Sequence, residues 1–129
     1  MKMDKVVHFE IPADKEDRAK KFYNKVFGWD ITPVPEMGYT MLQTGPTDKK
    51  GMAKDKGFIN GGMMKRKKPM ESVMITISVE DIDNTNKKIV KMGGKVVGEK
   101  LKIGEMGYIQ YFKDSEGNMI GLWENMNDS

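Results

Sequence analysis

Apolar and polar residues alternate along this chain in an order that occurs twice. Each half begins with a strand-like segment that ends in an acidic residue, Val7–Asp14 in the first half and Met74–Asp81 in the second. The two segments align at an offset of 67, because 75 minus 8 equals 81 minus 14. The pattern therefore predicts one structural module in two copies.

A helix is predicted directly after each of these strands. Apolar residues recur along Lys15–Phe27 at steps of three and one, which gives the helix an apolar stripe on one face. Asp14 is placed to cap its first turn, and Gly28 can end it in the left-handed conformation. The second helix, about Ile82–Met92, has a weaker stripe and is followed by a Gly-Gly pair. Both helices are expected to pack on a sheet.

Three strand-like segments follow each helix. They are Trp29–Pro33, Gly38–Gln43 and Phe58–Met64 in the first copy, and Lys95–Leu101, Gly107–Lys113 and Asn118–Glu124 in the second. The first copy also has a nine-residue insertion around Thr44–Lys56, and the sequence leaves open whether this polar loop is mobile or covers a site. The order predicts an α+β fold in which one domain, residues 1–129, contains a βαβββ module at about 3–66 and another at about 71–126.

The tetrapeptide Glu-Met-Gly-Tyr occurs in both halves and supports the duplication. It spans Glu36–Tyr39 and Glu105–Tyr108, 69 residues apart. The two tyrosines either present hydroxyl groups to a ligand or pack within their strands, and packing is the commoner role for a tyrosine on a half-buried strand.

Composition narrows the classes of protein and of chemistry. The chain has 129 residues with 38% apolar content, the size of one globular domain, and it has no cysteine and one histidine. No long apolar run or signal segment is evident, so we expect a cytoplasmic protein that does not enter membranes. The net charge of +3 comes mainly from lysine. The basic run Lys65–Lys68 lacks neighbouring aromatic residues, which favours a solvated linker over a nucleic-acid site.

The ends of the chain carry a family resemblance. The start reads HFEIP, then FY and FGW, and the last strand region reads DSEGNMIGLWE. This combination resembles the glyoxalase, bleomycin-resistance and extradiol-dioxygenase superfamily, also called the vicinal oxygen chelate superfamily. The resemblance implies that each copy forms a curled mixed sheet with its helix on the convex side, and that the paired concave sides enclose a pocket. It also implies a homodimer.

Enzymes of this superfamily hold a divalent metal with side chains from the first and last strands of each copy. Carried over by position, the resemblance places His8 at one ligand position and Ile75, which cannot bind a metal, at its counterpart. The last-strand positions fall on Gly121 and near Gly61. Strand alternation predicts that Glu124 points to the face opposite Gly121. We therefore expect no metal and no other cofactor. If a divalent metal does bind, His8 and Glu124 are the candidate ligands.

His8 and Glu10 are the candidate catalytic residues. They are two positions apart on one strand, so they share a face. Histidine changes charge near neutral pH, so the pair could act as acid and base or hold a ligand oxygen. A structural histidine is an equally good interpretation of the sequence.

Five residues are expected to line a ligand pocket, as rings that offer flat surfaces or as glycines that leave room: Tyr39, Gly61, Tyr108, Gly121 and Trp123. The leading hypothesis is a protein that binds a small, largely apolar molecule without a metal. The alternative is a lyase or isomerase related to lactoylglutathione lyase, in which His8 and Glu10 are acid-base groups or part of a metal site. The sequence does not decide between an enzyme and a binding protein. A purely structural module is a third possibility.

Overall fold

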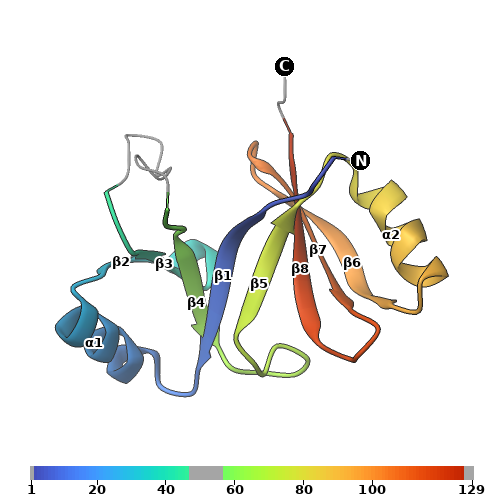
Figure 1. Ribbon diagram of the computed structural model, residues 1–129. Helices are drawn as coiled ribbons and strands as arrows, with labels where there is room; N and C mark the ends of the chain where they lie inside the picture. The colour runs from blue at the N-terminus through green and yellow to red at the C-terminus, as the bar shows by residue number, and fades with distance from the viewer. Residues whose placement is uncertain (1, 47–56, 127–129) are drawn as a thin grey trace. The chain divides into compact units, whose positions relative to one another are not determined.

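The computed structural model describes residues 2–46 and 57–126. The chain divides into two compact units, an amino-terminal unit, His8–Val73, and a carboxy-terminal unit, Met74–Ser129 together with Met1–Val7. In chain order, each half contains a strand, a helix and three further strands (Figure 1). The predicted α+β fold of two βαβββ modules is therefore confirmed.

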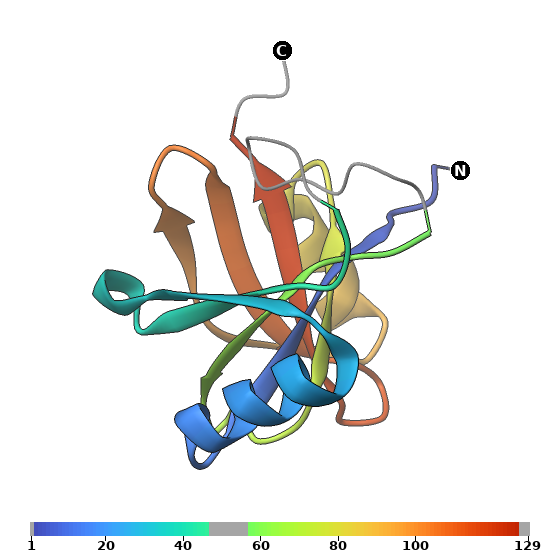
Figure 2. The same cartoon turned by 90° about the vertical axis from the view of Figure 1, so that its left-hand side faces the viewer.

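The amino-terminal unit is built on a four-stranded sheet in the order β2-β3-β4-β1. Its elements are β1 (Val6–Ala13), α1 (Glu16–Phe27), β2 (Asp30–Val34), the short 3-10 helix η1 (Pro35–Met37), β3 (Tyr39–Gln43) and β4 (Gly61–Lys65). Strands β1 and β4 run parallel, and the other neighbours are antiparallel. Helix α1 packs against β2 and β4 (Figure 2).

Strand alternation divides this sheet into two faces. The face toward α1 carries the apolar core, which consists of Phe9, Ile11, Ala13, Ala19, Tyr23, Trp29, Ile31, Leu42 and Met63. Leu42 and Met63 are fully buried there. Because side chains alternate, His8, Glu10 and Tyr39 point to the opposite face, which we call the far face.

The carboxy-terminal unit repeats this plan with the sheet order β5-β8-β7-β6. Its elements are β5 (Met74–Ser78), α2 (Ile82–Lys91), β6 (Lys95–Ile103), β7 (Gly107–Lys113) and β8 (Met119–Asn125). Residues of β5, β7 and β8 pack with α2 in the core, which consists of Ile77, Val79, Ile82, Ile89, Tyr108, Phe112, Ile120 and Leu122. The Ser78 amide donates to the Lys5 carbonyl at 2.8 Å, so the start of the chain lies beside β5.

The two helices begin differently, which corrects one prediction. The N-cap of α1 is Lys15 and no side chain caps it. Asp14 was predicted to cap α1, but its carboxylate instead accepts from Arg66 Nε at 2.9 Å. Asp14 precedes the N-cap position by one residue, so its carboxylate is free to pair with the arginine. Asp81 does cap α2, accepting from the Asn84 amide at 3.0 Å. The left-handed end of α1 at Gly28, with φ of 71°, is confirmed.

The core contacts also correct the offset between the first strands. Phe9 and Ala13 point toward α1, whereas Ile77 and Val79 point toward the α2 core. Ala13 and Val79 therefore point to the same side of their sheets, toward the helix. They are 66 positions apart, since 79 minus 13 is 66, so the offset between the copies is 66 rather than 67. The counterpart of His8 is therefore Met74 rather than Ile75. A shift of one residue exchanges the two faces of a strand, which is why a small error in alignment matters.

The segments that join the elements bear on two further expectations. The basic run begins at Lys65, the last residue of β4, and continues through Arg66, whose guanidinium is held by Asp14 and by the Glu71 carbonyl. Most of the predicted insertion, residues 47–56, lies outside the described residues. Among the described residues, no helix is long and apolar enough to cross a membrane.

Candidate functional site

The far face of the amino-terminal sheet brings His8 and Tyr39 together. His8 lies near the start of β1 and Tyr39 opens β3, two strands away in the sheet. His8 Nε2 and the Tyr39 hydroxyl are hydrogen-bonded at 2.7 Å, and their rings lie nearly parallel with centroids 6.4 Å apart. Both side chains are half-buried. Both residues were predicted as site residues, and the fold makes them partners.

A glycine on the intervening strand permits this contact. Gly62 of β4 pairs with Glu10 on one side and with Met41 on the other. A Cβ added at Gly62 would overlap the phenol of Tyr39, so the tyrosine ring occupies the space where a side chain would stand. The missing side chain is therefore what allows Tyr39 to reach across β4 to His8.

Glu10 lies next to this pair on the same face. It is two residues from His8 along β1, as the sequence predicts, and only 2% of its surface is exposed. Burial of a carboxyl group requires compensating polar contacts, so Glu10 belongs to a structured polar site rather than to the solvated surface. His8, Glu10 and Tyr39 form the candidate site of this unit.

Burial sets the protonation state of His8. Desolvation lowers the pKa of the imidazole below its ordinary value of 6.5. His8 is therefore neutral at pH 7, with one ring nitrogen that donates and one that accepts a hydrogen bond. A neutral imidazole of this kind can accept a proton or hold a ligand oxygen.

The corresponding face of the carboxy-terminal sheet, opposite α2, has a different chemistry. Thr76 of β5 pairs with Gly121 of β8, which pairs in turn with Tyr111 of β7. Trp123 lies on the same face, and its Nε1 donates to Asn125 Oδ1 at 2.7 Å. Thr76 occupies the position that Glu10 occupies in the other unit, 66 residues earlier. We call this surface the Thr76 face.

Two of the predicted pocket residues lie on the opposite faces of their sheets. The side chain of Phe9 covers Gly61 on the α1 side, because Gly61 is one residue out of phase with Gly62. Tyr108 packs in the α2 core, and Lys100 Nζ lies 5.0 Å from the centre of its ring. Tyr39, Gly121 and Trp123 lie on the faces away from the helices, whereas Gly61 and Tyr108 do not.

The residues at the ligand positions of the superfamily do not fit a metal. Those positions hold the imidazole of His8, which is hydrogen-bonded to the Tyr39 phenol, the thioether of Met74, and the glycines Gly62 and Gly121. Glu124 Oε1 accepts from the Ile82 amide at 2.8 Å, so this carboxylate supports the start of α2. Within residues 2–46 and 57–126, no three His, Asp or Glu side chains are grouped as metal ligands would be.

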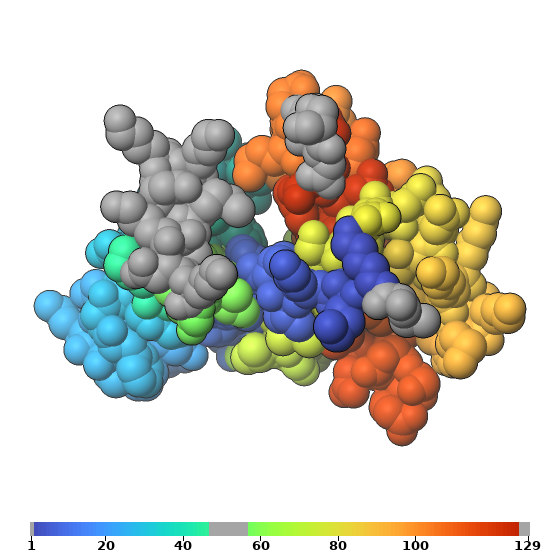
Figure 3. Space-filling view, turned by 45° about the horizontal axis from the view of Figure 1, so that its top comes forward, coloured from blue at the N-terminus to red at the C-terminus, as the bar shows by residue number. Residues whose placement is uncertain are grey.

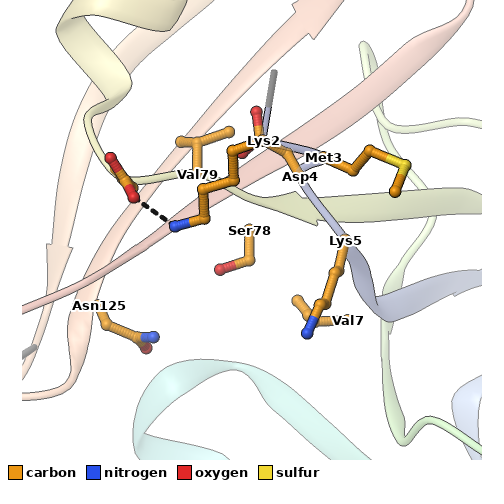
Figure 4. Close-up of a pocket in the computed structure, with 9 residues that line it drawn as sticks. Lys2, Met3, Asp4, Lys5, Val7, Ser78, Val79 and Asn125 are labelled. Atoms are coloured by element: carbon orange, nitrogen blue, oxygen red, sulfur yellow. Dashed lines mark hydrogen bonds and ion pairs between the residues drawn. The ribbon is translucent and has the colours of Figure 1, made fainter.

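A surface pocket of about 230 Å³ lies elsewhere in the carboxy-terminal unit. It is formed where the segment Lys2–Lys5 lies against Ser78–Glu80, the dark-blue and yellow segments in Figure 3. Figure 4 shows the Lys2 side chain extending to its ion pair with Glu80. Its volume is below the roughly 300–1,000 Å³ of most ligand pockets. None of the predicted pocket residues lines it, so it is not the predicted apolar pocket.

The sequence alone did not show which residues of neighbouring strands meet. The prediction included His8 and Tyr39 separately but not their hydrogen bond, and it omitted Gly62 and Thr76 from the ligand pocket. The Gly61-Gly62 pair was a signal that side chains are absent from β4. Which of the two glycines leaves room for Tyr39 can be decided only once the register of β4 against β1 and β3 is known. No sequence signal singled out Thr76.

Sequence comparisons relate the chain to several known proteins. A family model described as bleomycin resistance protein-like N-terminal matches residues 5–45. A glyoxylase-like domain-containing protein of Didymella fabae is 32% identical over 114 residues, which cover 84% of each chain. The protein of Mycobacterium bovis named as a glyoxylase, CFP32, is 30% identical over 119 residues. That match covers 89% of this chain but only 43% of the relative, so the chain spans less than half of its length.

Solved structures share the fold at lower identity. A hypothetical protein from Bacillus halodurans C-125 aligns over 99% of both chains with a TM-score of 0.66 and 14% identity. A methylmalonyl-CoA epimerase of Streptomyces coelicolor, in complex with 2-nitronate-propionyl-CoA, aligns over 98% of this chain and 100% of its own, with a TM-score of 0.64 and 20% identity. At these identities the likeness establishes the fold alone.

Proposed function

The chain belongs to the glyoxalase, bleomycin-resistance and dioxygenase superfamily, and from that premise we propose that it binds a small molecule on the far face of its amino-terminal sheet. The hydrogen bond between His8 and Tyr39 is the polar anchor of this site. The ligand is largely apolar and carries at least one oxygen that replaces or extends this hydrogen bond. Binding or sequestration, rather than metal-assisted catalysis, is the role we assign to the site.

The His8–Tyr39 pair is the observation that carries this proposal. A half-buried imidazole and phenol joined at 2.7 Å offer both a donor and an acceptor to a ligand. Met41, which pairs with Gly62 next to Glu10, supplies an adaptable apolar surface beside them. A few placed polar groups on a mainly apolar surface are typical of small-molecule sites.

The proposal does not use the metal of the superfamily. The donor set described above contains one imidazole where three or four ligands are expected. Elemental analysis of protein purified without chelators tests this part of the proposal. A stoichiometric divalent metal that is lost in His8→Ala would contradict it.

A ligand screen tests the binding site directly. Thermal denaturation with a library of apolar and aromatic metabolites should identify compounds that raise the melting temperature, because a ligand of the folded state stabilises it. Tyr39→Phe should weaken binding of such a compound by roughly threefold to tenfold, the usual worth of one neutral hydrogen bond.

Tyr108→Phe is the matched control for this screen. Tyr108 is the last residue of the second copy of the tetrapeptide, but it packs in the α2 core. Loss of its hydroxyl group should therefore leave ligand binding unchanged. Equal effects of the two substitutions, or a library without any stabilising compound, would contradict the proposed site.

A proton-transfer enzyme is the second candidate, and the neutral state of His8 favours it. In this alternative His8 takes a proton from a carbon next to a substrate carbonyl and returns it to the same or the neighbouring carbon, as in a lyase or isomerase. Two sequence relatives are a glyoxylase and a glyoxylase-like domain protein, and a structural neighbour is a methylmalonyl-CoA epimerase, which supports this class of reaction as the second candidate.

The hemithioacetal of methylglyoxal and glutathione is a suitable substrate for this test. In deuterated water, His8-dependent entry of deuterium into the product would support catalysis, and no difference between wild type and His8→Ala would exclude this role. Glu10→Gln tests whether the neighbouring carboxyl group takes part.

A second copy of the chain is also part of the proposal, since the superfamily resemblance implies a homodimer. Light scattering coupled to size-exclusion chromatography measures the mass in solution. A mass near 14.7 kDa, that of one chain, would contradict a dimer.

A further inference from the structure

Methionine supplies all the sulfur of this chain, and its thioethers differ widely in exposure. The chain has thirteen methionines and no cysteine. Among the described residues, four of them have 55–85% of their surface exposed, and we call them the exposed methionines: Met3, Met37, Met92 and Met106. Two others, which we call the core methionines, are 0% and 2% exposed: Met63 and Met74. Small solutes therefore reach one group directly and not the other.

Three of the exposed methionines lie at the end of an element or in a turn. Met37 is the last residue of η1. Met106 lies between β6 and β7, where its amide donates to the Ile103 carbonyl at 3.0 Å. The Met92 amide donates to the Lys88 carbonyl at 3.0 Å, at the end of α2. The backbone at these positions belongs to a hydrogen-bonded helix end or turn, while the side chain extends into solvent.

The repeated tetrapeptide supplies two of these thioethers. Met37 and Met106 are its second residues, and they are 55% and 67% exposed. The tyrosines of the two copies have different surroundings, since Tyr39 bonds to His8 and Tyr108 packs in the α2 core. The exposed thioether is thus the side-chain feature that both copies retain.

A thioether reacts with a hydroperoxide at neutral pH. The sulfur attacks one peroxide oxygen and the O–O bond breaks. The proton of the attacked oxygen passes to the leaving oxygen, which departs as water from hydrogen peroxide or as an alcohol from an alkyl hydroperoxide. Sulfur is oxidised by two electrons to the sulfoxide, and the peroxide is reduced by two. The polar sulfoxide is tolerated in solvent but is costly in an apolar core.

We propose that the exposed methionines are reversible oxidation sites, at which the folded protein consumes a hydroperoxide and gains one oxygen atom per side chain. The core methionines remain reduced, so the fold persists. A methionine sulfoxide reductase then restores the thioethers with a dithiol, which becomes a disulfide as the sulfoxide oxygen leaves as water. This chemistry uses neither His8 nor Tyr39, and it goes beyond the proposed function.

Hydrogen peroxide alone is the first probe. After treatment of the folded protein and proteolytic digestion, mass spectrometry measures oxidation at each methionine. The exposed methionines should react roughly tenfold or more faster than the core methionines, because a buried thioether reacts only after local opening. In denaturing urea the rates should become similar. Equal rates for the two groups in the folded protein would overturn the inference.

The melting temperature of the oxidised protein tests whether the fold tolerates the sulfoxides. It should stay within about 3 °C of the untreated value, since changes to exposed side chains affect stability little. Incubation with dithiothreitol and the two methionine sulfoxide reductases, one for each sulfoxide epimer, should then remove the added oxygen. Unfolding on oxidation, or sulfoxides that the reductases leave in place, would overturn the proposal.

Leucine variants assign the consumption of peroxide to these positions. A variant that combines Met3→Leu, Met37→Leu, Met92→Leu and Met106→Leu should consume hydrogen peroxide roughly twofold or more slowly than the wild type. Met63→Leu is the matched control, because it replaces a core thioether by a side chain of similar volume and should leave the rate unchanged. Equal rates in the wild type and the combined variant would overturn the inference.

Discussion

Gly62 and Gly121 occupy equivalent positions in the two units, yet their missing side chains serve different purposes. Gly62 pairs with Glu10 and Met41, and Gly121 pairs with Thr76 and Tyr111. The ring of Tyr39 occupies the space where a side chain at Gly62 would stand, whereas a Cβ added at Gly121 would lie 3.0 Å from Thr76 Oγ1 and 3.5 Å from Cε1 of Tyr111.

This comparison shows how a repeated fold can hold two different surfaces. In the amino-terminal unit, the glycine allows two distant polar side chains to form a hydrogen bond. In the carboxy-terminal unit, the glycine lies beside the Thr76 hydroxyl, which is buried and has no hydrogen-bond partner among the described residues. The backbone pairing is the same, so the difference arises from the side chains on the neighbouring strands.

The largest expected effect is the difference in stability between alanine substitutions at the two glycines. Gly62→Ala should lower the free energy of unfolding by about 1–3 kcal/mol, because the new methyl group overlaps the Tyr39 phenol and forces the ring away from His8. Gly121→Ala should change it by only about 0.5 kcal/mol. Urea denaturation of both variants measures the difference, and equal losses would show that the two positions are equivalent after all.

The helix caps give the next contrast. Asp81→Ala should cost about 1 kcal/mol, because it removes the acceptor for the Asn84 amide in the first turn of α2. Asp14→Ala, at the matching place in the sequence pattern, should cost less than about 0.5 kcal/mol because it loses only an exposed ion pair with Arg66. Chemical denaturation would contradict this account if Asp14→Ala were the more destabilising change.

The two repeated tyrosines should respond differently to loss of the hydroxyl group. Tyr39→Phe leaves the half-buried His8 without its partner and should lower stability by about 1 kcal/mol. Tyr108→Phe keeps the ring in the α2 core and should cost less than about 0.5 kcal/mol. If both variants unfold at the same urea concentration as the wild type, the hydrogen bond to His8 contributes nothing to stability.

The pH dependence of stability isolates the amino-terminal site, since His8 is the only histidine. The pKa of His8 is lowered in the folded protein, so the unfolded chain binds more protons as pH falls below about 6.5. Stability associated with neutral His8 should therefore be present above pH 6.5 and be lost as the pH falls toward the folded pKa. His8→Gln should show a shallower decline in melting temperature over this range. An identical pH profile in the variant would contradict burial of a neutral imidazole.

The repeated tetrapeptide illustrates the limit of comparing the copies by sequence. Glu-Met-Gly-Tyr recurs at an interval of 69 residues, but the register makes Met41 equivalent to Tyr111, an interval of 70. Gly38 is left-handed, with φ of 61°, whereas the left-handed glycine of the second turn is Gly104. The same four residues thus enter their strands one position out of phase, which places Tyr39 on the far face and Tyr108 in the core.

The sequence by itself determined the order of strands and helices, the duplication, and the shared face of His8 and Glu10. Each of these depends on local periodicity, which is a property of neighbouring residues. The tertiary structure decided that Tyr39 reaches His8 across Gly62, and that Thr76 lies beside Gly121. Those contacts depend on the register between distant strands, where a shift of one residue moves every side chain to the other face.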